Sequence, residues 1–362
     1  MTNRELYKWI GICLAMDHRP DYRNRVLEQV VEGSIPWELF VSTCSNHLIT
    51  PTIFLTFKKH DIVRHLPQGL MEYLAEVTQL NAARNEKIIS QMAEITDALR
   101  SYRINPIFLK GSAHLIDQLY PEIAYRMVGD IDFLVREQDY LRSVQILSDI
   151  GYQCRCQVYG DPMNLKHYPR MWKENGAADI EIHRIPVSEK YAKWLNYQVI
   201  VSEMYSPIGN PDCFVLSDKH KIILNFIHSQ LGHSGKTMGI VSYRDIYDLH
   251  LLMQRHGKPV SGVDSEFAGS AGSYFQIADH LLHLNDLKEY SIPLKRSLFF
   301  KIHQLNLSSR TFYLIYHGLR RTIIRIRAYS RILLGIVTSA ELRKLVFDRL
   351  SHPPWIRKFP QW

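Results

Sequence analysis

Residues 104–135, INPIFLKGSAHLIDQLYPEIAYRMVGDIDFLV, decide which fold we expect for this chain. The run 104–109 is short and largely apolar, and Lys-Gly-Ser at 110–112 closes it. That pattern predicts a buried strand, a sharp turn, and a helix that begins near Ala113. A second strand is expected at residues 130–135. The stretch should therefore form a strand, a helix and a strand in succession.

The second of these strands carries two carboxylates. Because successive side chains of a strand lie on opposite faces, Asp130 and Asp132 should point the same way, with the apolar residues beside them on the core side. Two carboxylates held side by side repel each other, which favours a cation between them. Oxygen ligands and open coordination positions favour Mg²⁺ over zinc. The backbone N–H groups of Gly111 and Ser112 add a phosphate-binding turn on the neighbouring strand.

A third acidic segment follows further along the chain. Residues 178–184, ADIEIHR, alternate polar and apolar side chains and come after an Asn-Gly pair at 175–176. The pair predicts a turn and the alternation predicts a strand. Asp179, Glu181 and His183 should share one face of that strand.

On these residues the sequence resembles the nucleotidyltransferase superfamily of the DNA polymerase beta type. Its signature is a strand, a Gly-Ser turn, a helix and a strand with Asp-x-Asp, matched here by Gly111-Ser112 and Asp130-Ile131-Asp132. The segments LKGSA, YRMVGDIDFLV and DIEIH look more closely like a bacterial family described only as uncharacterised nucleotidyltransferases, in which the arginine at Arg126 recurs. The resemblance covers roughly residues 35–260. The gap from Ser112 to Asp130 is longer than is usual in the superfamily, which we expect to extend the helix and loop between them.

The resemblance implies a reaction and a catalytic site. Nucleotidyl transfer takes a nucleoside monophosphate from an NTP and uses two Mg²⁺ ions held roughly 3.5 to 4 Å apart. Asp130 and Asp132 would ligate both ions, and Glu181, which matches the family's glutamate in the strand ending in Glu-x-His, would be the third catalytic and metal-binding carboxylate. Asp179 is the alternative third carboxylate, or a partner for a lysine or arginine. His183 could orient a carboxylate or contact the acceptor, and a core histidine bonded to the backbone explains it nearly as well.

Cations are needed to neutralise a triphosphate beside three carboxylates. Lys110 and Arg126 are the first candidates, and with Gly111 and Ser112 they form the expected nucleotide-binding set. Either cation could equally be a structural ion-pair partner. Lys166 and Lys173 are weaker candidates for these cations, His228 and His233 are weak candidates for a metal site, and the pair Arg244-Asp245 is a candidate for the lining of the cleft. The spacing of five does not place the two histidines on one face of an α-helix, and the Arg-Asp pair could line a cleft or join two helices.

The remaining patterns predict an α+β fold, in which a small mixed sheet of about four or five strands is flanked by helical regions at both ends. We expect a helical N-terminal region at 1–100, a catalytic core at 101–216, and a helical C-terminal region with a basic arm at 217–362. The clearest helix is long and amphipathic, from about 68 to 100. Other expected elements are a helix at 138–150, a strand at 152–159, helices at 217–231 and 241–256, and a turn-rich linker at 257–272.

The composition bounds the class of protein. The 362 residues are 46% hydrophobic and 22% charged, which is ordinary for a globular protein and enough for two domains. The five cysteines show no spacing typical of a disulfide framework or zinc site, which favours the cytoplasm. No signal peptide is expected, and no uncharged apolar stretch approaches the roughly 20 residues of a membrane span.

Positive charge is concentrated at the C-terminal end. Residues 291–362 contain 14 basic and two acidic residues, a net charge of +12, whereas the preceding 290 contain 30 basic and 34 acidic residues, a net charge of −4. From 313 to 350, apolar residues alternate with arginines, which predicts helices packed on the body beneath an arginine ridge. The ridge could form salt bridges to the acidic remainder, bind an anionic acceptor or nucleic acid, or adhere to an anionic membrane. We favour a ridge that borders the active-site cleft and attracts an anionic acceptor.

Three classes of function fit the sequence. They are an enzyme that transfers a nucleoside monophosphate to a hydroxyl, phosphate or amine, a catalytically degenerate NTP-binding regulator, and an interaction module. The enzyme is favoured because the three carboxylates and the Gly-Ser turn are all present, whereas a degenerate member should have lost at least one. The expected acceptor is an anionic small molecule, a peptide or a sugar sooner than a nucleic acid. The sequence predicts no oligomeric state.

Overall fold

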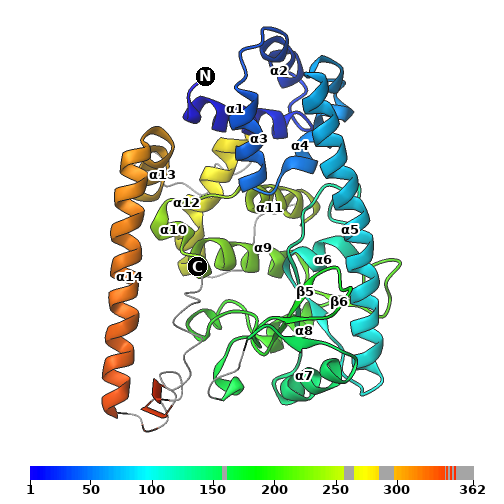
Figure 1. The fold of residues 1–362 in the computed structure, drawn as a ribbon, viewed down its shortest axis with the longest axis vertical. Helices are drawn as coiled ribbons and strands as arrows, with labels where there is room; N and C mark the ends of the chain where they lie inside the picture. Colours follow the sequence, from blue (N-terminus) through cyan, green and yellow to red (C-terminus); the bar gives the residue numbers. More distant parts are fainter. Residues whose placement is uncertain are drawn as a thin grey trace.

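The computed structural model of the chain describes residues 1–156, 161–256, 265–284 and 297–338, together with 340, 343–344 and 346–347. Figure 1 shows N-terminal helices at one end, the sheet with its helices at the other, and one long C-terminal helix along a side. Helices and a single mixed sheet make up the described residues, so the predicted α+β class is confirmed.

Four helices open the chain: α1 (Asn3–Ala15), α2 (Tyr22–Val31), α3 (Trp37–Asn46) and α4 (Thr50–Lys59). Helix α1 begins at a capping box, in which the side chain of Thr2 accepts from the N–H of Glu5 and the carboxylate of Glu5 accepts from the N–H of Thr2. The helix contacts α4 and also two helices from the other end of the chain, α12 (Ser265–Leu282) and α13 (Leu298–Ser308). A side chain at Gly11 would collide with the carbonyl oxygen of Leu281, so this glycine allows α1 and α12 to pack closely.

Helix α5 (Gln68–Arg100) is the long amphipathic helix that the sequence predicts. Its buried apolar residues, among them Leu74, Ile88 and Leu99, recur at helical spacing along one side. It contacts α4 near one end and α6 and α7 near the other. Figure 1 shows that α5 therefore joins the N-terminal helices to the sheet region.

The sheet has six strands in the order β3-β4-β5-β2-β1-β6. They are β1 (Ile107–Phe108), β2 (Asp130–Leu134), β3 (Gln153–Cys154), β4 (Met171–Trp172), β5 (Asp179–His183) and β6 (Phe214–Val215). Strand β2 is central, parallel to β5 and antiparallel to β1. The prediction of four or five strands is wrong because four of the six are only two residues long, which leaves no alternation to detect. Strand β3 covers part of the strand predicted at 152–159, and residues 157–160 lie outside the described residues.

Helices α6 (Lys110–Ile116) and α7 (Tyr140–Asp149) cover the sheet, and α8 (Tyr197–Glu203) precedes β6. The expected start near Ala113 is wrong, since Lys-Gly-Ser forms the first turn of α6. Helix α6 is only seven residues long, so the extra length before β2 lies in the loop 117–129 and not in the helix. The side-chain amides of Asn81 and Asn85 on α5 both donate to the carbonyl oxygen of Arg126, which ties this loop to the long helix.

The two faces of the sheet differ. Ile131, Phe133 and Ile180 pack with α5 and α7 in one hydrophobic cluster. The polar side chains of β2 and β5 alternate with them and lie on the other face. A second cluster joins the N-terminal helices to α9, α11 and α12. The ends of the chain thus share one core, and the division at residues 100 and 216 stays a prediction.

The C-terminal region is helical, as predicted. Helix α9 (Asp218–Phe226) continues into a π-helical turn (Ile227–Gly232), and α10 (Gly235–Met238), α11 (Tyr243–His256), α12 (Ser265–Leu282), α13 (Leu298–Ser308) and α14 (Arg310–Thr338) follow. The linker predicted at 257–272 is wrong from Ser265 onward, because Phe267, Ala271 and Tyr274 are buried at helical spacing in α12. Residues 257–264 lie outside the described residues. Across the part of the chain that the structure describes, no helix is both long and apolar enough to cross a bilayer.

Candidate functional site

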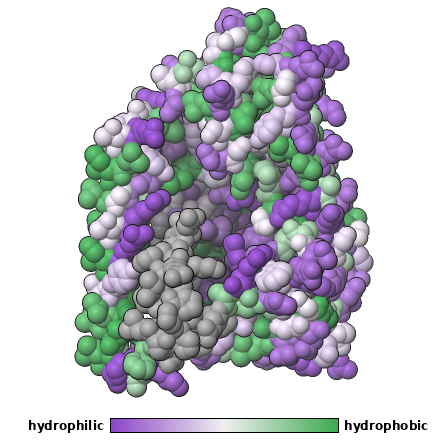
Figure 2. Space-filling model, in the orientation of Figure 1, coloured by the Kyte–Doolittle hydropathy of each residue, from purple (hydrophilic) through white to green (hydrophobic). Residues whose placement is uncertain are grey.

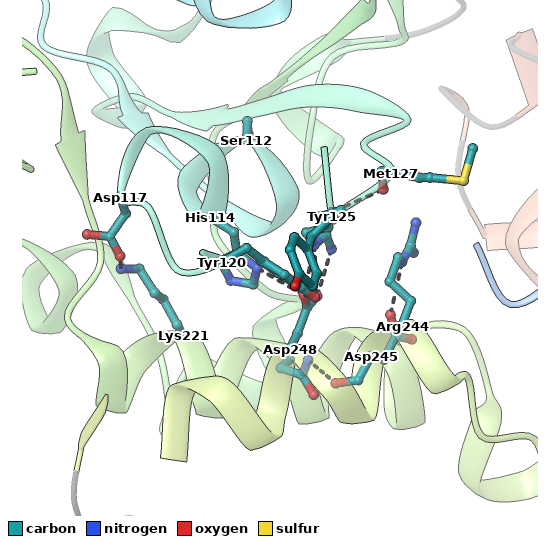
Figure 3. Close-up of polar contacts among 12 residues, drawn as sticks. Ser112, His114, Asp117, Tyr120, Tyr125, Met127, Lys221, Arg244, Asp245 and Asp248 are labelled. Atoms are coloured by element: carbon teal, nitrogen blue, oxygen red, sulfur yellow. Dashed lines mark hydrogen bonds and ion pairs between the residues drawn. The ribbon is translucent and has the colours of Figure 1, made fainter. Parts of the chain in front are cut away.

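A cavity of about 510 Å³ lies between the polar face of the sheet and helices α9 and α11. Six of the seven predicted site residues line it: Lys110, Gly111, Arg126, Asp130, Asp132 and Glu181. The seventh, Ser112, does not. Its buried hydroxyl donates to the carbonyl oxygen of Leu109 at 2.7 Å, and Figure 3 shows it on the side of α6 away from His114. The hydroxyl of Ser112 is therefore not available to a phosphate in the cavity.

The carboxylates are positioned by the pairing of β2 with β5. The two strands run parallel in a register that sets Asp132 opposite Glu181 and Asp130 opposite Asp179. Asp132 and Glu181 are buried, and Asp130 is half-buried. His183 Nε2 lies 2.8 Å from Asp132 Oδ1, so of the roles expected for His183 the contacts favour orienting that carboxylate. Ligand atoms of Asp132, Glu181 and His183 all lie within 4.8 Å of one another, which is a spacing that one metal ion can span.

Two cations pair with the three carboxylates. Lys110 Nζ lies 2.6 Å from Asp132 Oδ1. Arg170 bridges the other two, with Nε 2.8 Å from Glu181 Oε1 and Nη2 2.8 Å from Asp130 Oδ2. Arg170 could not be predicted from the sequence, because it lies just before the two-residue strand β4, in a stretch with no periodicity to place it. Each predicted carboxylate thus has a basic partner in the folded chain.

The surroundings move the pKa values of the three carboxyl groups in different directions. Burial, together with repulsion from Asp132 and Glu181, raises the pKa of Asp130. Burial also opposes ionisation of Asp132, but Lys110 and His183 outweigh it and hold its pKa well below the usual range. Burial of Glu181 is likewise outweighed, mainly by His183, and its pKa falls to about 2. Asp132 and Glu181 are therefore ionised at neutral pH, as ligands of a cation must be.

Arg126 is held by a carboxylate on α11. Its Nη2 and Nε lie 2.7 and 2.8 Å from the two carboxylate oxygens of Asp248, and both side chains are buried. Tyr120 donates to Asp248 at 2.6 Å, and Figure 3 shows Tyr120 and His114 pointing at it from the loop and from α6. A side chain at Gly111 would collide with the Arg126 guanidinium, so this position requires glycine. Of the two roles expected for Arg126, the contacts show the structural ion pair, at the wall of the cavity.

Two weaker candidates are engaged away from the cavity. Asp179 accepts two hydrogen bonds from Arg155, at 2.6 and 2.9 Å, and Lys173 pairs with Glu94. Neither Asp179 nor Lys173 is part of the cavity lining, whereas Lys166 and Arg244 are. Arg244 Nε lies 3.5 Å from Asp245 Oδ1 and makes no hydrogen bond within the described residues, which favours the cleft-lining role over the helix-packing role.

His228 and His233 form a pair, against the expectation from their spacing. Their rings are 4.3 Å apart and both line the cavity. The spacing of five fits because residues 227–232 form a π-helical turn, in which the N–H of His233 donates to the carbonyl of His228. Burial and the nearby Lys110 lower the pKa of both imidazoles, so they are neutral at neutral pH. Within the described residues they belong to no group of three metal ligands.

The basic C-terminal arm lies elsewhere. Its helix, α14, contacts mainly α13 and α10, and none of its described residues lines the cavity. The expectation that the arginine ridge borders the cleft is therefore wrong. Figure 1 shows α14 running from α13 along one side of the molecule, separate from β2 and β5.

A strand–helix–strand unit with carboxylates on two adjacent strands and a basic cavity above them is the architecture of a nucleotidyltransferase domain. The chain belongs to the family described as uncharacterised nucleotidyltransferases, whose sequence model matches residues 33–262. The matched residues run from α3 to α11 and include the whole acidic centre. No curated protein and no solved structure matches the chain.

Proposed function

We propose that this protein is a Mg²⁺-dependent nucleotidyltransferase of the DNA polymerase beta-type superfamily. It transfers a nucleoside monophosphate from an NTP to a hydroxyl, phosphate or amine of a second substrate. The observation that carries the proposal is the register of β2 and β5, which sets Asp132 beside Glu181 and leaves Asp130 one pleat away at the same cavity wall. Three carboxylates at a cavity that also contains Lys110 and Lys166 suit a metal-bound triphosphate.

The carboxylates fit divalent ions. Mg²⁺ prefers oxygen ligands, so Asp130, Asp132 and Glu181 would hold two ions, with His183 orienting Asp132. The Arg170 side chain is 55% exposed and is therefore free to move when an ion takes its place beside Glu181. When bound, Mg²⁺ neutralises the triphosphate and stabilises the charge that develops during transfer.

The protein's own residues bind and orient the substrates. A bond forms between the acceptor atom and the α-phosphorus, the bond from that phosphorus to the pyrophosphate oxygen breaks, and the proton of a hydroxyl or amine acceptor passes to solvent water. Lys110, Lys166 and Arg244 line the cavity and supply positive charge for the triphosphate and for the leaving pyrophosphate. Glu181, with a pKa of about 2, is a weak proton acceptor and serves better as a metal ligand than as a base.

The volume of the cavity limits the size of the second substrate. A volume of about 510 Å³ lies within the range of small-molecule sites, and Pro186, Val187 and Tyr191 give it one apolar wall. An anionic small molecule, a sugar or a peptide end suits such a space better than a nucleic acid does. We place the protein in the cytoplasm, where NTPs are made and where its five free cysteines stay reduced.

One observation favours a second candidate, a catalytically degenerate NTP-binding regulator. Each of the three carboxylates already pairs with a basic side chain, Asp132 with Lys110 and the other two with Arg170. In such a protein the basic residues would bind the triphosphate directly. Two results together would establish this alternative: the protein binds an NTP when Mg²⁺ is absent, and it releases no pyrophosphate when Mg²⁺ is present.

Glu181→Gln should lower nucleotidyl transfer by about 10²-fold or more while leaving NTP affinity largely unchanged, because it removes one metal ligand and no phosphate contact. Asp179→Asn is the matched control, since Asp179 lies two residues earlier on β5 and pairs with Arg155 outside the cavity. Pyrophosphate release and nucleotide binding should be measured for both variants. A more severe loss in Asp179→Asn than in Glu181→Gln would move the third ligand to Asp179.

A further inference from the structure

Helix α14 stands apart from the rest of the chain. Its anchor to the body is near its start, where the hydroxyl of Tyr316 donates to the carbonyl of Thr237 at 2.8 Å and His317 is buried. Beyond that anchor nearly all its described residues are exposed or partly exposed. Figure 1 shows it as a long rod along one side of the molecule. It also lies outside the matched family residues, 33–262, so it is an addition to the nucleotidyltransferase domain.

One face of α14 is apolar and open to water. We define the α14 stripe as six aliphatic residues with exposed fractions between 41% and 77%: Ile315, Leu319, Ile323, Ile326, Leu333 and Val337. Their spacings of three, four and seven residues place them on one side of the helix. Figure 2 shows hydrophobic residues along the outer edge of the molecule, where Figure 1 places α14. The stripe spans roughly 33 Å at 1.5 Å per residue.

The arginines of α14 lie on its other sides, beside further exposed aliphatic residues such as Leu314, Ile324 and Leu334. Arg310, Arg321, Arg325 and Arg327 are exposed, and residues 310–338 contain no aspartate or glutamate. Among the described residues, no ion pair joins these arginines to a carboxylate of the body, so charge neutralisation within that part of the chain does not account for them. A partner for this helix must therefore be both apolar and anionic.

We propose that α14 binds the surface of an anionic lipid bilayer, with the α14 stripe among the acyl chains and the arginines at the level of the lipid phosphates. A bilayer meets both requirements at once. A second copy of the helix would cover the stripe but would bring together two arginine-rich helices with no carboxylate between them. A nucleic acid would engage the arginines and leave the stripe in water. The proposal concerns a region outside the cavity and does not depend on the transfer reaction.

Binding of the full chain to vesicles tests the proposal. The protein should float with vesicles of phosphatidylcholine containing phosphatidylglycerol, bind far less to pure phosphatidylcholine, and lose binding at high salt. The variant Leu319→Ser/Ile326→Ser/Leu333→Ser should bind about tenfold or more weakly, because three aliphatic side chains no longer leave water. The variant Arg321→Gln/Arg325→Gln/Arg327→Gln should lose a similar factor.

The matched control is Val31→Ser/Leu80→Ser/Ile208→Ser, which removes three exposed aliphatic residues from other parts of the surface and should bind as the wild type does. All the substituted side chains are at the surface, so the fold is retained, and circular dichroism checks it. Equal binding by the stripe variant, or no binding to anionic vesicles, overturns the proposal. So does a lipid-free dimer that the stripe variant dissociates, since the stripe would then contact a second copy. The proposal also fails if a nucleic acid displaces the vesicles and binds the stripe variant as tightly as it binds the wild type. The partner of α14 would then be a nucleic acid and not a bilayer.

Discussion

The variant Asp132→Asn should transfer nucleotide at least about 10³-fold more slowly than the wild type, because metal ions supply several kcal/mol of transition-state stabilisation and each 1.4 kcal/mol is a factor of ten. Asp132 is the most buried of the three carboxylates and lies opposite Glu181, so it would hold the ions together with Asp130 and Glu181. Asparagine keeps its shape but loses its charge. Pyrophosphate release should be measured with each of the four NTPs, Mg²⁺, and a panel of sugar, peptide and small-molecule acceptors.

Asp179→Asn is again the matched control, because it removes a carboxylate from the adjacent strand without touching the cavity. Circular dichroism and the unfolding midpoint should confirm that Asp132→Asn is folded. A folded Asp132→Asn protein that releases pyrophosphate at the wild-type rate would exclude the metal site on β2.

The second large effect is on stability. Asp248→Asn should lower the free energy of unfolding by about 3–5 kcal/mol, because it leaves the Arg126 guanidinium buried without its counter-charge. The pair joins the loop before β2 to α11, so its loss also loosens the cavity wall. Urea unfolding followed by circular dichroism measures the difference.

A surface ion pair provides the control for this prediction. Arg155→Gln breaks the ion pair between Arg155 and Asp179, in which the Arg155 side chain is 54% exposed. It should lower the free energy of unfolding by about 1 kcal/mol or less. The double variant Arg126→Met/Asp248→Leu should recover much of the loss, since it leaves no unpaired buried charge. Equal effects of Asp248→Asn and Arg155→Gln would contradict the importance given to the buried pair.

The same pair predicts a pH dependence. Burial opposes ionisation of Asp248, but Arg126 and His114 hold its pKa below the usual value. Because this carboxyl group ionises more readily in the folded chain, the pair stabilises the fold at pH values above the unfolded pKa of about 3.9. That stability declines as the pH falls further, toward the folded pKa. In Asp248→Asn the acid limb of the stability curve should accordingly be shallower than in the wild type.

The sequence predicted the parts of the site that follow from local patterns. Alternation placed Asp130 and Asp132 on one face of β2, and helical spacing defined α5. The register that sets Asp132 opposite Glu181 joins strands about fifty residues apart, and no local pattern encodes it. Arg126 and Asp248 are 122 residues apart and lie in different elements, so their ion pair could not be predicted from local sequence patterns either.

Two further features, the histidine pair and the exposed α14 stripe, depend on three-dimensional geometry that the periodicity of the sequence does not predict. The pair of His228 and His233 needs a π-helical turn, whereas an α-helix would place residues five apart on different faces. The apolar and basic residues of α14 were evident from the sequence. Their exposure was not, because an amphipathic helix ordinarily buries its apolar face against its own chain.

Calorimetric titration of an NTP into the protein tests the central claim, the carboxylate metal site, most directly, since it requires no knowledge of the acceptor. With Mg²⁺ or Mn²⁺ the wild type should bind the NTP, and in EDTA the affinity should fall by about 10²-fold or more, because the triphosphate then meets three carboxylates whose charge Lys110 and Arg170 offset only in part. Asp132→Asn should show little difference between the two conditions. Equal affinity of the wild type with Mg²⁺ and in EDTA would contradict the metal site on which the proposed transfer depends.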